Sequence, residues 1–403
     1  MTISQDAVCR STRSPISTST PRCTCAPSRS ADARARRASY NGRVNERASR
    51  IVVGLSGGVD SAVAALRLVE RGCEVHGLFM ANWEDDDGYC TAAQDFQDAR
   101  AVAGVLGIPL HRVDFSREYR DRVFAHFLAE YEAGRTPNPD VLCNREIKFG
   151  VCLAHARRLG AGRFATGHYA QLHVGDGPEL HKGSDPSRDQ SYFLHSIERA
   201  ALACIEFPIG ALPKDEVRAR ARAAGLPVYD KPDSTGICFI GERPFREFLS
   251  RYIAATPGPI ETPAGERVGI HHGLAFYTLG QRGGLEVGGR AGHVEGAWYV
   301  ARKDRARNSL MVVQGHDHPL LLSRALVTGP MHWLAPAPVA PFQAKAKVRY
   351  RQADQAVNVM PLANGRARLE FDLDQRAVTP GQYAVLYEGT RCLGGGVIEF
   401  TSG

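Results

Sequence analysis

Apolar and polar positions alternate with two different periods from residue 51 onward. Short apolar runs bounded by glycine or proline, typical of buried strands, occur at 51–55, 74–80 and 109–115. Between them, residues 61–72 and 94–107 repeat apolar residues every three or four positions, which predicts helices. Strands that alternate with helices indicate a parallel, doubly wound α/β sheet. In such sheets ligands lie at the carboxyl ends of the strands.

The same pattern continues through the next hundred residues. Residues 118–134 and 147–160 have helical spacing, and 163–170 predicts a further strand. Residues 243–253 predict a last clear helix, after which short strands are separated by proline and glycine.

The last eighty residues have an all-β pattern. Asn364-Gly365 stands between two of these runs and predicts a tight hairpin. We interpret the region as a small C-terminal β-barrel, with strands expected at 343–351, 356–362, 366–371, 382–388 and 392–400. The predicted organisation is a basic extension (1–50), a catalytic α/β domain (51–242), a central linking domain (243–318) and the barrel (319–403).

Charge separates the first fifty residues from the rest of the chain. They hold ten arginines and three acidic residues, which accounts for the whole formal net charge of +7. This segment has almost no large apolar residues, so we expect it to be disordered. Its Arg- and Ser-rich composition is also that of an organellar transit peptide, although it lacks a clear amphipathic face.

The remaining composition is that of an ordinary globular protein. No apolar run approaches the roughly 20 residues of a membrane helix, and we expect a cytoplasmic protein with no membrane partner. The ten cysteines include no C-x-x-C pair at zinc-ligand spacing, so they are interpreted as individual thiols. Four of them lie in apolar runs and are expected to be core residues: Cys73, Cys152, Cys204 and Cys392.

Between the first predicted strand and helix, "GLSGGVDS" is a candidate phosphate-binding loop. Backbone N–H groups and the positive end of the helix dipole favour an anion there, and Gly57 and Gly58 allow close approach. Asp60 either orients a magnesium ion or caps the helix. The string resembles the signature of the ATP pyrophosphatase (PP-loop) superfamily, which adenylates a substrate oxygen and releases pyrophosphate.

Cysteine placement separates the members of that superfamily, because amide-forming ligases use ammonia and RNA sulfurtransferases use a cysteine persulfide. Cys143 follows the turn "TPNPD", and Cys238 lies in "DSTGICFIGERPF". Each follows turn residues and precedes a predicted helix, a setting that lowers a thiol pKa. Either cysteine alone is equally well explained as a buried thiol, but the pair favours sulfur chemistry.

Several long motifs in one order extend the resemblance from Ile51 to the C-terminus. They are "GLSGGVDS", "GLFMANWEDDDGYCTAAQD", "AGRTPNPDVLCNREIKF", "ATGHY", "RDQSYFL", "DSTGICFIGERPFREFL", "YTLGQRGGL", "VRYRQ" and "CLGGG". Together they resemble the bacterial tRNA-specific 2-thiouridylase family. The resemblance implies a catalytic α/β domain, a central domain and a C-terminal β-barrel, in agreement with the periodicity.

The resemblance also implies roles for individual residues. Cys143 is the expected nucleophile, Cys238 carries the persulfide and later forms a disulfide with Cys143, and Asp140 is a candidate base. The implied ATP contacts are Gly54, Leu55, Ser56, Gly57, Gly58, Val59, Asp60, Ser61, Met80 and Gly167. The implied tRNA contacts are Asn138, Pro139, Asp140, Arg188, Asp189, Gln190, Arg349 and Tyr350.

Two of the implied tRNA contacts carry a qualification, and one further residue is a candidate. Arg188 stands where the family more often has lysine, which keeps the charge and changes the geometry of the contact. Arg349 and Tyr350, taken without the resemblance, are an ordinary strand surface. His168, next to Gly167, is a candidate for the nucleotide pocket.

The implied reaction adenylates the C2 oxygen of a wobble uridine in the tRNAs for Lys, Glu and Gln, and then transfers sulfur. ATP with Mg²⁺ is the expected cofactor, no resident metal is expected, and a cysteine desulfurase or sulfur-relay protein loads Cys238. Two alternatives stay open, an ammonia-using ligase without paired cysteines and an RNA-binding protein gated by a disulfide. The acidic loop 84–87 and the histidines 271, 272, 316 and 318 are interpreted as polar surface.

Overall fold

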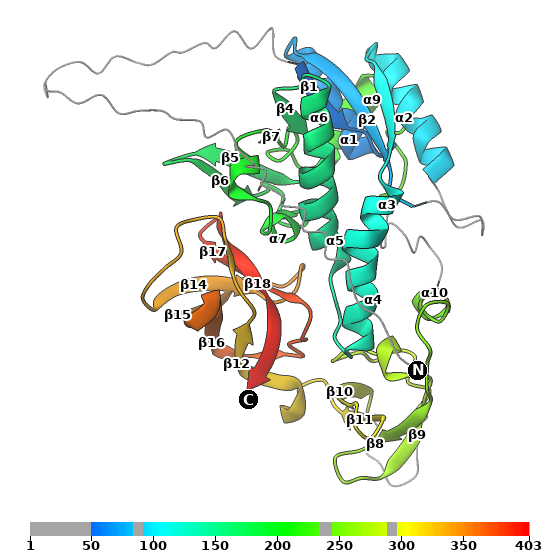
Figure 1. The fold of residues 1–403 in the computed structure, drawn as a ribbon, viewed down its shortest axis with the longest axis vertical. Coiled ribbons are helices and arrows are strands. Elements are labelled where there is room, and N and C mark those ends of the chain that lie inside the picture. Colours follow the sequence, from blue (N-terminus) through cyan, green and yellow to red (C-terminus); the bar gives the residue numbers. More distant parts are fainter. Residues whose placement is uncertain (1–49, 84–91, 234–243, 288–295, 403) are drawn as a thin grey trace, which may run out of the picture. The chain divides into compact units, whose positions relative to one another are not determined.

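The computed structural model describes residues 50–83, 92–233, 244–287 and 296–402 (Figure 1). The basic extension, the acidic loop and the segment that carries Cys238 therefore lie outside the described residues. Among the described residues, no helix is long and apolar enough to cross a membrane.

The catalytic part is built on a five-stranded sheet in the order β3-β2-β1-β4-β7, with every neighbouring pair parallel. Its strands are β1 (Arg50–Gly54), β2 (Glu74–Ala81), β3 (Leu110–Asp114), β4 (Arg163–Ala165) and β7 (Ile205–Glu206). The order reverses between β1 and β4, which makes that point the topological switch where a ligand is expected. This sheet confirms the predicted doubly wound α/β fold.

The described helices include some that lie beside this sheet and some that lie away from it (Figure 1). They are α1 (Val59–Glu70), α2 (Ala92–Leu106), α3 (Ser116–Tyr119), α4 (Ala125–Glu132), α5 (Pro139–Leu142), α6 (Leu153–Arg158), α7 (Ser191–Leu194), α8 (Arg199–Leu202), α9 (Lys214–Ala223) and α10 (Phe245–Leu249). Two π-helical segments, η2 (Arg120–Phe124) and η3 (Cys143–Cys152), join helices into longer runs. The expected helix 147–160 thus begins earlier, at Pro139, and passes through η3 into α6.

A nine-stranded sheet contains the C-terminal barrel. Strand β12 pairs with both β16 and β18, which closes six strands into a barrel. The barrel strands are β12 (Leu322–Thr328), β14 (Phe342–Lys347), β15 (Gln355–Pro361), β16 (Ala367–Arg376), β17 (Tyr383–Glu388) and β18 (Arg391–Ser402), with β13 (His332–Trp333) beside β18. The predicted barrel is confirmed.

The hairpin between β15 and β16 follows from its residues. Asn364 and Gly365 both have positive φ, at 60° and 71°, which is the conformation that the Asn-Gly pair favours. The flanking strands pair antiparallel from Pro361 and Ala367 onward. The predicted hairpin is confirmed.

The hairpin β5 (Ala170–Val174) and β6 (Pro178–Lys182) joins the barrel sheet, since Arg391 of β18 pairs with His181. The expected strand 163–170 is therefore wrong as one element. Residues 166–169 leave the sheet after β4, and the chain then enters a different sheet at β5.

The central part has its own small core. Its sheet has the order β10-β11-β8-β9, formed by β8 (Gly258–Glu261), β9 (Arg267–His271), β10 (Trp298–Asp304) and β11 (Ser309–Gln314). Ile260, Val300, Leu310 and Val312 are completely buried in it. The helix expected at 243–253 is shorter, since α10 ends at Leu249. Short 3-10 turns lie at η4 (Leu274–Phe276), η5 (Pro319–Leu321) and η6 (Ala363–Gly365).

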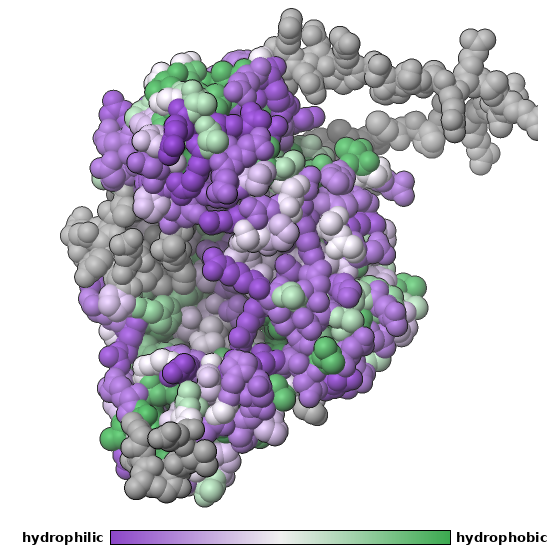
Figure 2. Space-filling view, turned by 180° about the vertical axis from the view of Figure 1, so that it is seen from behind, coloured by the Kyte–Doolittle hydropathy of each residue, from purple (hydrophilic) through white to green (hydrophobic). Residues whose placement is uncertain are grey.

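The surface is mainly hydrophilic on the face shown in Figure 2, with apolar residues in small separate patches. Among the described residues, strongly exposed apolar side chains such as Val174, Val339 and Leu373 lie on different elements. This distribution gives no reason to expect a broad apolar docking face there.

Candidate active site

The glycine loop between β1 and α1 has a backbone that only glycine fits. Gly57 has a φ of 78°, and a Cβ on it would lie 2.3 Å from the carbonyl oxygen of Asp95. Ser61 Oγ donates to the Gly58 carbonyl at 3.0 Å, and the Ser56 N–H donates to Ser61 Oγ at 3.2 Å. The loop is thus closed by its own hydroxyls, while Ser56 stays exposed.

Asp60 does not cap helix α1, so that interpretation is wrong. The N-cap residue is Gly58, and no side chain caps it. The Asp60 carboxylate instead accepts hydrogen bonds from Lys214 Nζ at 2.8 and 2.9 Å and from the Tyr169 hydroxyl at 2.7 Å. Burial, with the Asp60 charge as the next cause, raises the pKa of Tyr169 far above its usual value, so its hydroxyl stays protonated as a donor.

Two lysines beside the loop were missed by the sequence analysis. Lys214 is only 6% exposed and bridges Asp60 and Asp233, with a Nζ–Oδ1 distance of 2.6 Å to the latter. Lys231 Nζ donates to the Gly57 carbonyl at 3.1 Å and pairs with Asp95. Both lie far along the chain from the loop, and no spacing in the sequence connects them to it.

Met80 and Gly167 are brought to the loop by strand register. Gly54 pairs with Leu78, and Val53 pairs with Ala165, so Met80 and Gly167 follow at the same edge of the sheet. A Cβ on Gly167 would lie 2.6 Å from the backbone of Asp60 and Ser61. Gly167 is therefore needed for the close packing of its loop against the start of α1.

Cys143 lies inside a helical run rather than in front of one. Asn138 is the N-cap, Pro139 the first helical residue, and the Cys143 N–H bonds to the Pro139 carbonyl. The thiol is buried, with Cys143 only 3% exposed. Beyond it the helix is π-helical through Cys152, a rare geometry that occurs often at functional sites.

Cys238, which the sequence analysis pairs with Cys143, lies outside the described residues. It follows Asp233 by five residues in the sequence. The Asp233 carboxylate is held by Lys214, by Arg218 at 3.2 Å and by Arg188 at 2.7 Å. The described chain on the N-terminal side of Cys238 is thus anchored beside the glycine loop.

Asp140 and Lys148 lie on the helical run that carries Cys143. Burial raises the pKa of Asp140, and the charge of Lys148 opposes that shift. Lys148 Nζ is 3.5 Å from His168 Nε2, and His168 Nδ1 is 2.8 Å from Thr166 Oγ1. Burial, together with the charge of Lys148, lowers the pKa of His168 well below its usual value. His168 is therefore neutral.

The turn before this helix is held by the barrel and the central part. Gln382 Nε2 donates to the carbonyls of Thr136 and Pro137, at 2.8 and 3.2 Å. Thr136 Oγ1 lies 3.3 Å from Thr278 Oγ1. Next to them in the chain, the buried Oδ1 of Asn138 has no hydrogen-bond partner among the residues that the structure describes. This amide is available to a ligand.

The side chains of "RDQ" all have partners within the protein. Arg188 bonds to Asp233, and Gln190 Oε1 accepts from the Tyr169 N–H at 3.0 Å. Asp189 is 4% exposed, accepts two backbone N–H bonds and lies 3.5 Å from Lys347 of the barrel. Arg188 and Gln190 are partly exposed, whereas Asp189 is buried. Contact of this run with tRNA stays a prediction.

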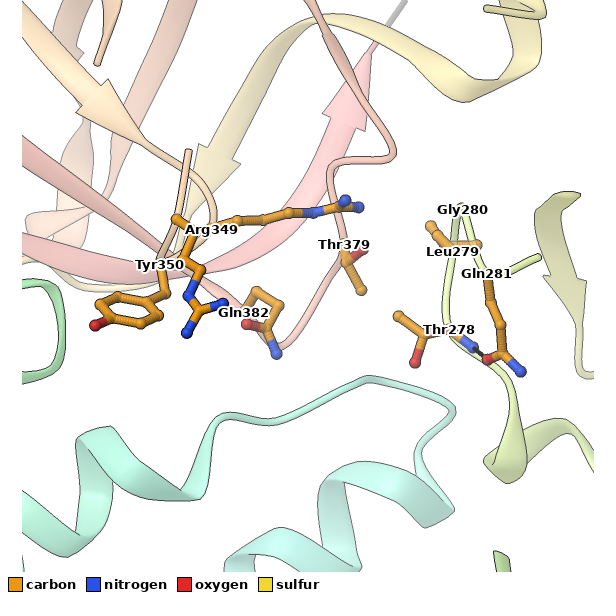
Figure 3. Close-up of a pocket in the computed structure, with 9 residues that line it drawn as sticks. Thr278, Leu279, Gly280, Gln281, Arg349, Tyr350, Thr379 and Gln382 are labelled. Carbon is orange, nitrogen blue, oxygen red and sulfur yellow. Dashed lines mark hydrogen bonds between the residues drawn. The ribbon is translucent and has the colours of Figure 1, made fainter. Parts of the chain in front are cut away.

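Arg349 and Tyr350 lie in a turn after β14, so their expected place in a strand is wrong, since β14 ends at Lys347. They line a pocket of about 520 Å³ with Arg351, Gln382 and the segment 278–281 (Figure 3). In Figure 3 the side chains of Arg349 and Tyr350 point in different directions.

Both predicted residues are already packed within the protein. Tyr350 packs against Phe193 with ring centroids 4.4 Å apart, and Arg349 donates to the Ala377 carbonyl. The exposed cation at this pocket is Arg351, which the sequence analysis did not select as a contact.

The remaining sequence predictions have mixed outcomes. Cys152 and Cys392 are buried, as expected, whereas Cys73 and Cys204 are only partly buried. The interpretation of His271 as surface is wrong, because it is fully buried and bonds to the Asn308 carbonyl. Within the ranges that the structure describes, no group of three or more His, Cys, Asp or Glu residues could hold a metal ion.

The parallel sheet with its glycine loop before α1, followed by a central domain and a barrel, defines an enzyme of the ATP-using PP-loop class. Three family models match: tRNA methyl transferase HUP domain over 49–242, tRNA methyl transferase PRC-barrel domain over 246–314 and aminomethyltransferase beta-barrel domain over 323–398. The chain belongs to the tRNA-specific 2-thiouridylase family, a family of sulfurtransferases.

That assignment rests on curated relatives that match most of the chain. The tRNA-specific 2-thiouridylase MnmA of Methylibium petroleiphilum is 56% identical and covers 87% of this chain and 98% of its own length. The MnmA of Alkalilimnicola ehrlichii is 58% identical, with 87% and 97% covered. A solved structure, the U34-tRNA thiolase NcsA from Methanococcus maripaludis, is 20% identical, with 51% and 64% covered and a TM-score of 0.33.

Proposed function

We propose that this chain converts the wobble uridine (position 34) of the tRNAs for Lys, Glu and Gln to 2-thiouridine, with release of AMP and pyrophosphate. The observation that carries the proposal is the contact between Lys148 and His168, at 3.5 Å. It joins the helix of Asp140 and Cys143 to the loop of Gly167. This contact between the two segments supports the proposed action of Asp140 and Cys143 beside the nucleotide.

The first step activates the uridine. Its C2 oxygen attacks the α-phosphorus of ATP, the O–Pα bond forms, and the bond to pyrophosphate breaks. The loop from Gly54 to Ser61 holds the departing pyrophosphate, with backbone N–H groups at the N-terminus of α1. Asp140 takes the proton that the uridine loses, and its raised pKa makes it a better base than an ordinary carboxylate.

Magnesium enters with ATP in this proposal. Bound Mg²⁺ neutralises phosphate charge and favours the departure of pyrophosphate. The carboxylate suited to it is Asp60, which lies at the loop and is partly exposed. Lys214 holds both of its oxygens, so a magnesium ion at Asp60 would take the place of that ammonium.

The second step transfers sulfur. In one route the terminal sulfur of a Cys238 persulfide attacks C2, and Cys143 then attacks the Cys238 sulfur and frees the thiouridine. In the other route Cys143 attacks Cys238 first, and the released hydrosulfide attacks C2. AMP leaves in both routes, and both end in a Cys143–Cys238 disulfide that an external thiol reduces.

Partners follow from this chemistry. A cysteine desulfurase or a sulfur-relay protein supplies the persulfide sulfur, and a cytoplasmic location remains a prediction. The tRNA is proposed to contact Asn138, Pro139 and Asp140 at the reacting base. Farther along the tRNA, the proposed contacts are Arg188, Asp189, Gln190, Arg349 and Tyr350.

The test is mass spectrometry of tRNA incubated with the protein, Mg-ATP and a sulfide or desulfurase source. We expect 2-thiouridine at the wobble position, with one pyrophosphate released per uridine, and none without ATP. Thiol-insensitive ATP cleavage that depends on ammonia would contradict the proposal and favour a ligase. Binding of tRNA that follows redox state without ATP use would favour the disulfide-gated RNA-binding protein.

A further inference from the structure

Lys148 is a cation between the two halves of the candidate site. It follows Cys143 by five residues in η3, and a π-helix bonds residues that are five apart, so the two lie on successive turns. Its charge acts on Asp140 and His168, which places the ammonium near both the candidate base and the nucleotide loop.

His168 directs this ammonium. His168 is buried and neutral, and its Nδ1 is 2.8 Å from Thr166 Oγ1. When Nδ1 carries the proton and donates to the threonine, Nε2 accepts from Lys148 Nζ at 3.5 Å. One N–H of the ammonium is then used, and Lys148 has no second hydrogen-bond partner among the described residues, so the other two N–H groups can serve a ligand.

Lys148 also differs from the other lysines near the site. Lys214 and Lys231 each pair with two carboxylates. Within the part of the chain that the structure describes, Lys148 has no carboxylate ion-pair partner, although its side chain is partly buried. A partly buried ammonium in this setting is suited to an anion.

We propose that Lys148 is a further catalytic residue, which contacts the α-phosphate of ATP in the transition state and stabilises the negative charge that develops on it. The inference rests on the proposed function and assigns a role that the predicted ATP contacts do not include. His168 is its positioning residue.

The role requires no proton transfer. When the C2 oxygen attacks, the new O–Pα bond forms as the bond to pyrophosphate breaks, and charge gathers on the remaining oxygens of the α-phosphate. The same phosphate leaves as AMP when sulfur displaces it from C2, taking the C–O bonding electrons. An ammonium held in place before either step stabilises both transition states more than the ground state.

The test compares Lys148→Met, Lys148→Gln and Lys148→Arg with wild type in the full chain. We expect the kcat of tRNA-dependent pyrophosphate release to fall about 100-fold or more in the first two variants. Calorimetric ATP affinity and the KM for tRNA should change less than about threefold, since the lost interaction belongs to the transition state. Lys148→Arg keeps the charge and should retain more activity than either neutral variant.

The pH–rate profile tests whether the charge of Lys148 acts on the candidate base. Because the charge of Lys148 opposes the raised pKa of Asp140, its removal should move the acidic limb of the pH–rate profile to higher pH. Lys148→Arg should leave that limb in place. Arg158→Met, an exposed cation of the same helical run, is the matched control and should behave as wild type.

The outcomes separate the two proposals. If Lys148→Met and Lys148→Gln release pyrophosphate at near wild-type kcat while Cys143→Ser forms no 2-thiouridine, the role of Lys148 is wrong and the proposed function stands. A loss confined to ATP or tRNA affinity would likewise overturn it. If wild type itself releases no pyrophosphate with tRNA, the proposed function fails, and this inference fails with it.

Discussion

Lys214 holds both carboxylate oxygens of Asp60, at 2.8 and 2.9 Å, although the two residues are 154 positions apart in the sequence. The pair fixes the carboxylate beside the glycine loop. The two carboxylate oxygens that bind Lys214 are therefore also the atoms proposed to bind the metal. Substitution can separate these two functions.

Asp60→Asn is expected to lower the rate of tRNA-dependent pyrophosphate release by about 100-fold or more, because the metal-binding charge is lost. The amide keeps the shape and can still accept from Tyr169, so thermal unfolding should change little. Asp60→Ala removes both roles and should also lower stability, since the buried Lys214 then loses one of its two carboxylate partners. Unchanged release in Asp60→Asn would show that the residue serves only Lys214.

Cys143→Ser and Cys238→Ser should each abolish thiolation and leave ATP binding intact. A serine hydroxyl can neither carry the persulfide nor attack it at neutral pH. Mass spectrometry of tRNA and calorimetry with ATP measure the two effects separately. Cys152→Ala is the matched control, since this buried thiol lies on the same helix and has no proposed role. Full thiolation by either serine variant would refute the assignment of the pair.

Gly167→Ala should disturb the nucleotide site through backbone packing alone. Its new methyl would lie 2.6 Å from the backbone of Asp60 and Ser61, so the loop must shift. We expect a destabilisation of about 1–3 kcal/mol and a loss of ATP affinity. Gly104→Ala in α2 is the control, because a Cβ there meets no atom within 4 Å. Because this variant removes a glycine from a helix interior, it should stabilise the protein by about 0.5–1 kcal/mol. Equal ATP affinity in both variants would contradict the packing argument.

Asp140→Asn should separate activity from stability. Burial raises the pKa of Asp140 in the fold, so the fold favours its protonated form. The stability that the Asp140 side chain contributes is fully present at pH values below the ordinary carboxyl pKa. It is lost as the pH rises through the raised pKa of the folded state. The neutral amide should therefore keep or raise the melting temperature at pH 7.

The same variant loses the proposed base, so adenylation should fall about 10²- to 10⁴-fold. In wild type the rate should rise with pH through the raised pKa. Differential scanning calorimetry and a pH–rate profile of pyrophosphate release test both parts. A variant with a wild-type rate would exclude Asp140 as the base.

The sequence by itself determined the fold class and the local chemistry. The periods of apolar residues predicted the α/β sheet and the barrel, because burial on one face imposes those periods. The glycine loop at Gly57 and the Asn364-Gly365 hairpin were also predictable, since each depends on backbone conformations that few residues adopt.

Only the tertiary structure decided which charges meet. Lys214, Lys231 and Lys148 reach the site through register and helix packing, and no local pattern marks them among the other lysines. The same holds for Asp189, whose motif suggested a surface contact but whose carboxylate faces Lys347 of the barrel. Ion pairs between distant segments depend on where the elements pack, which the spacing within any one element does not contain.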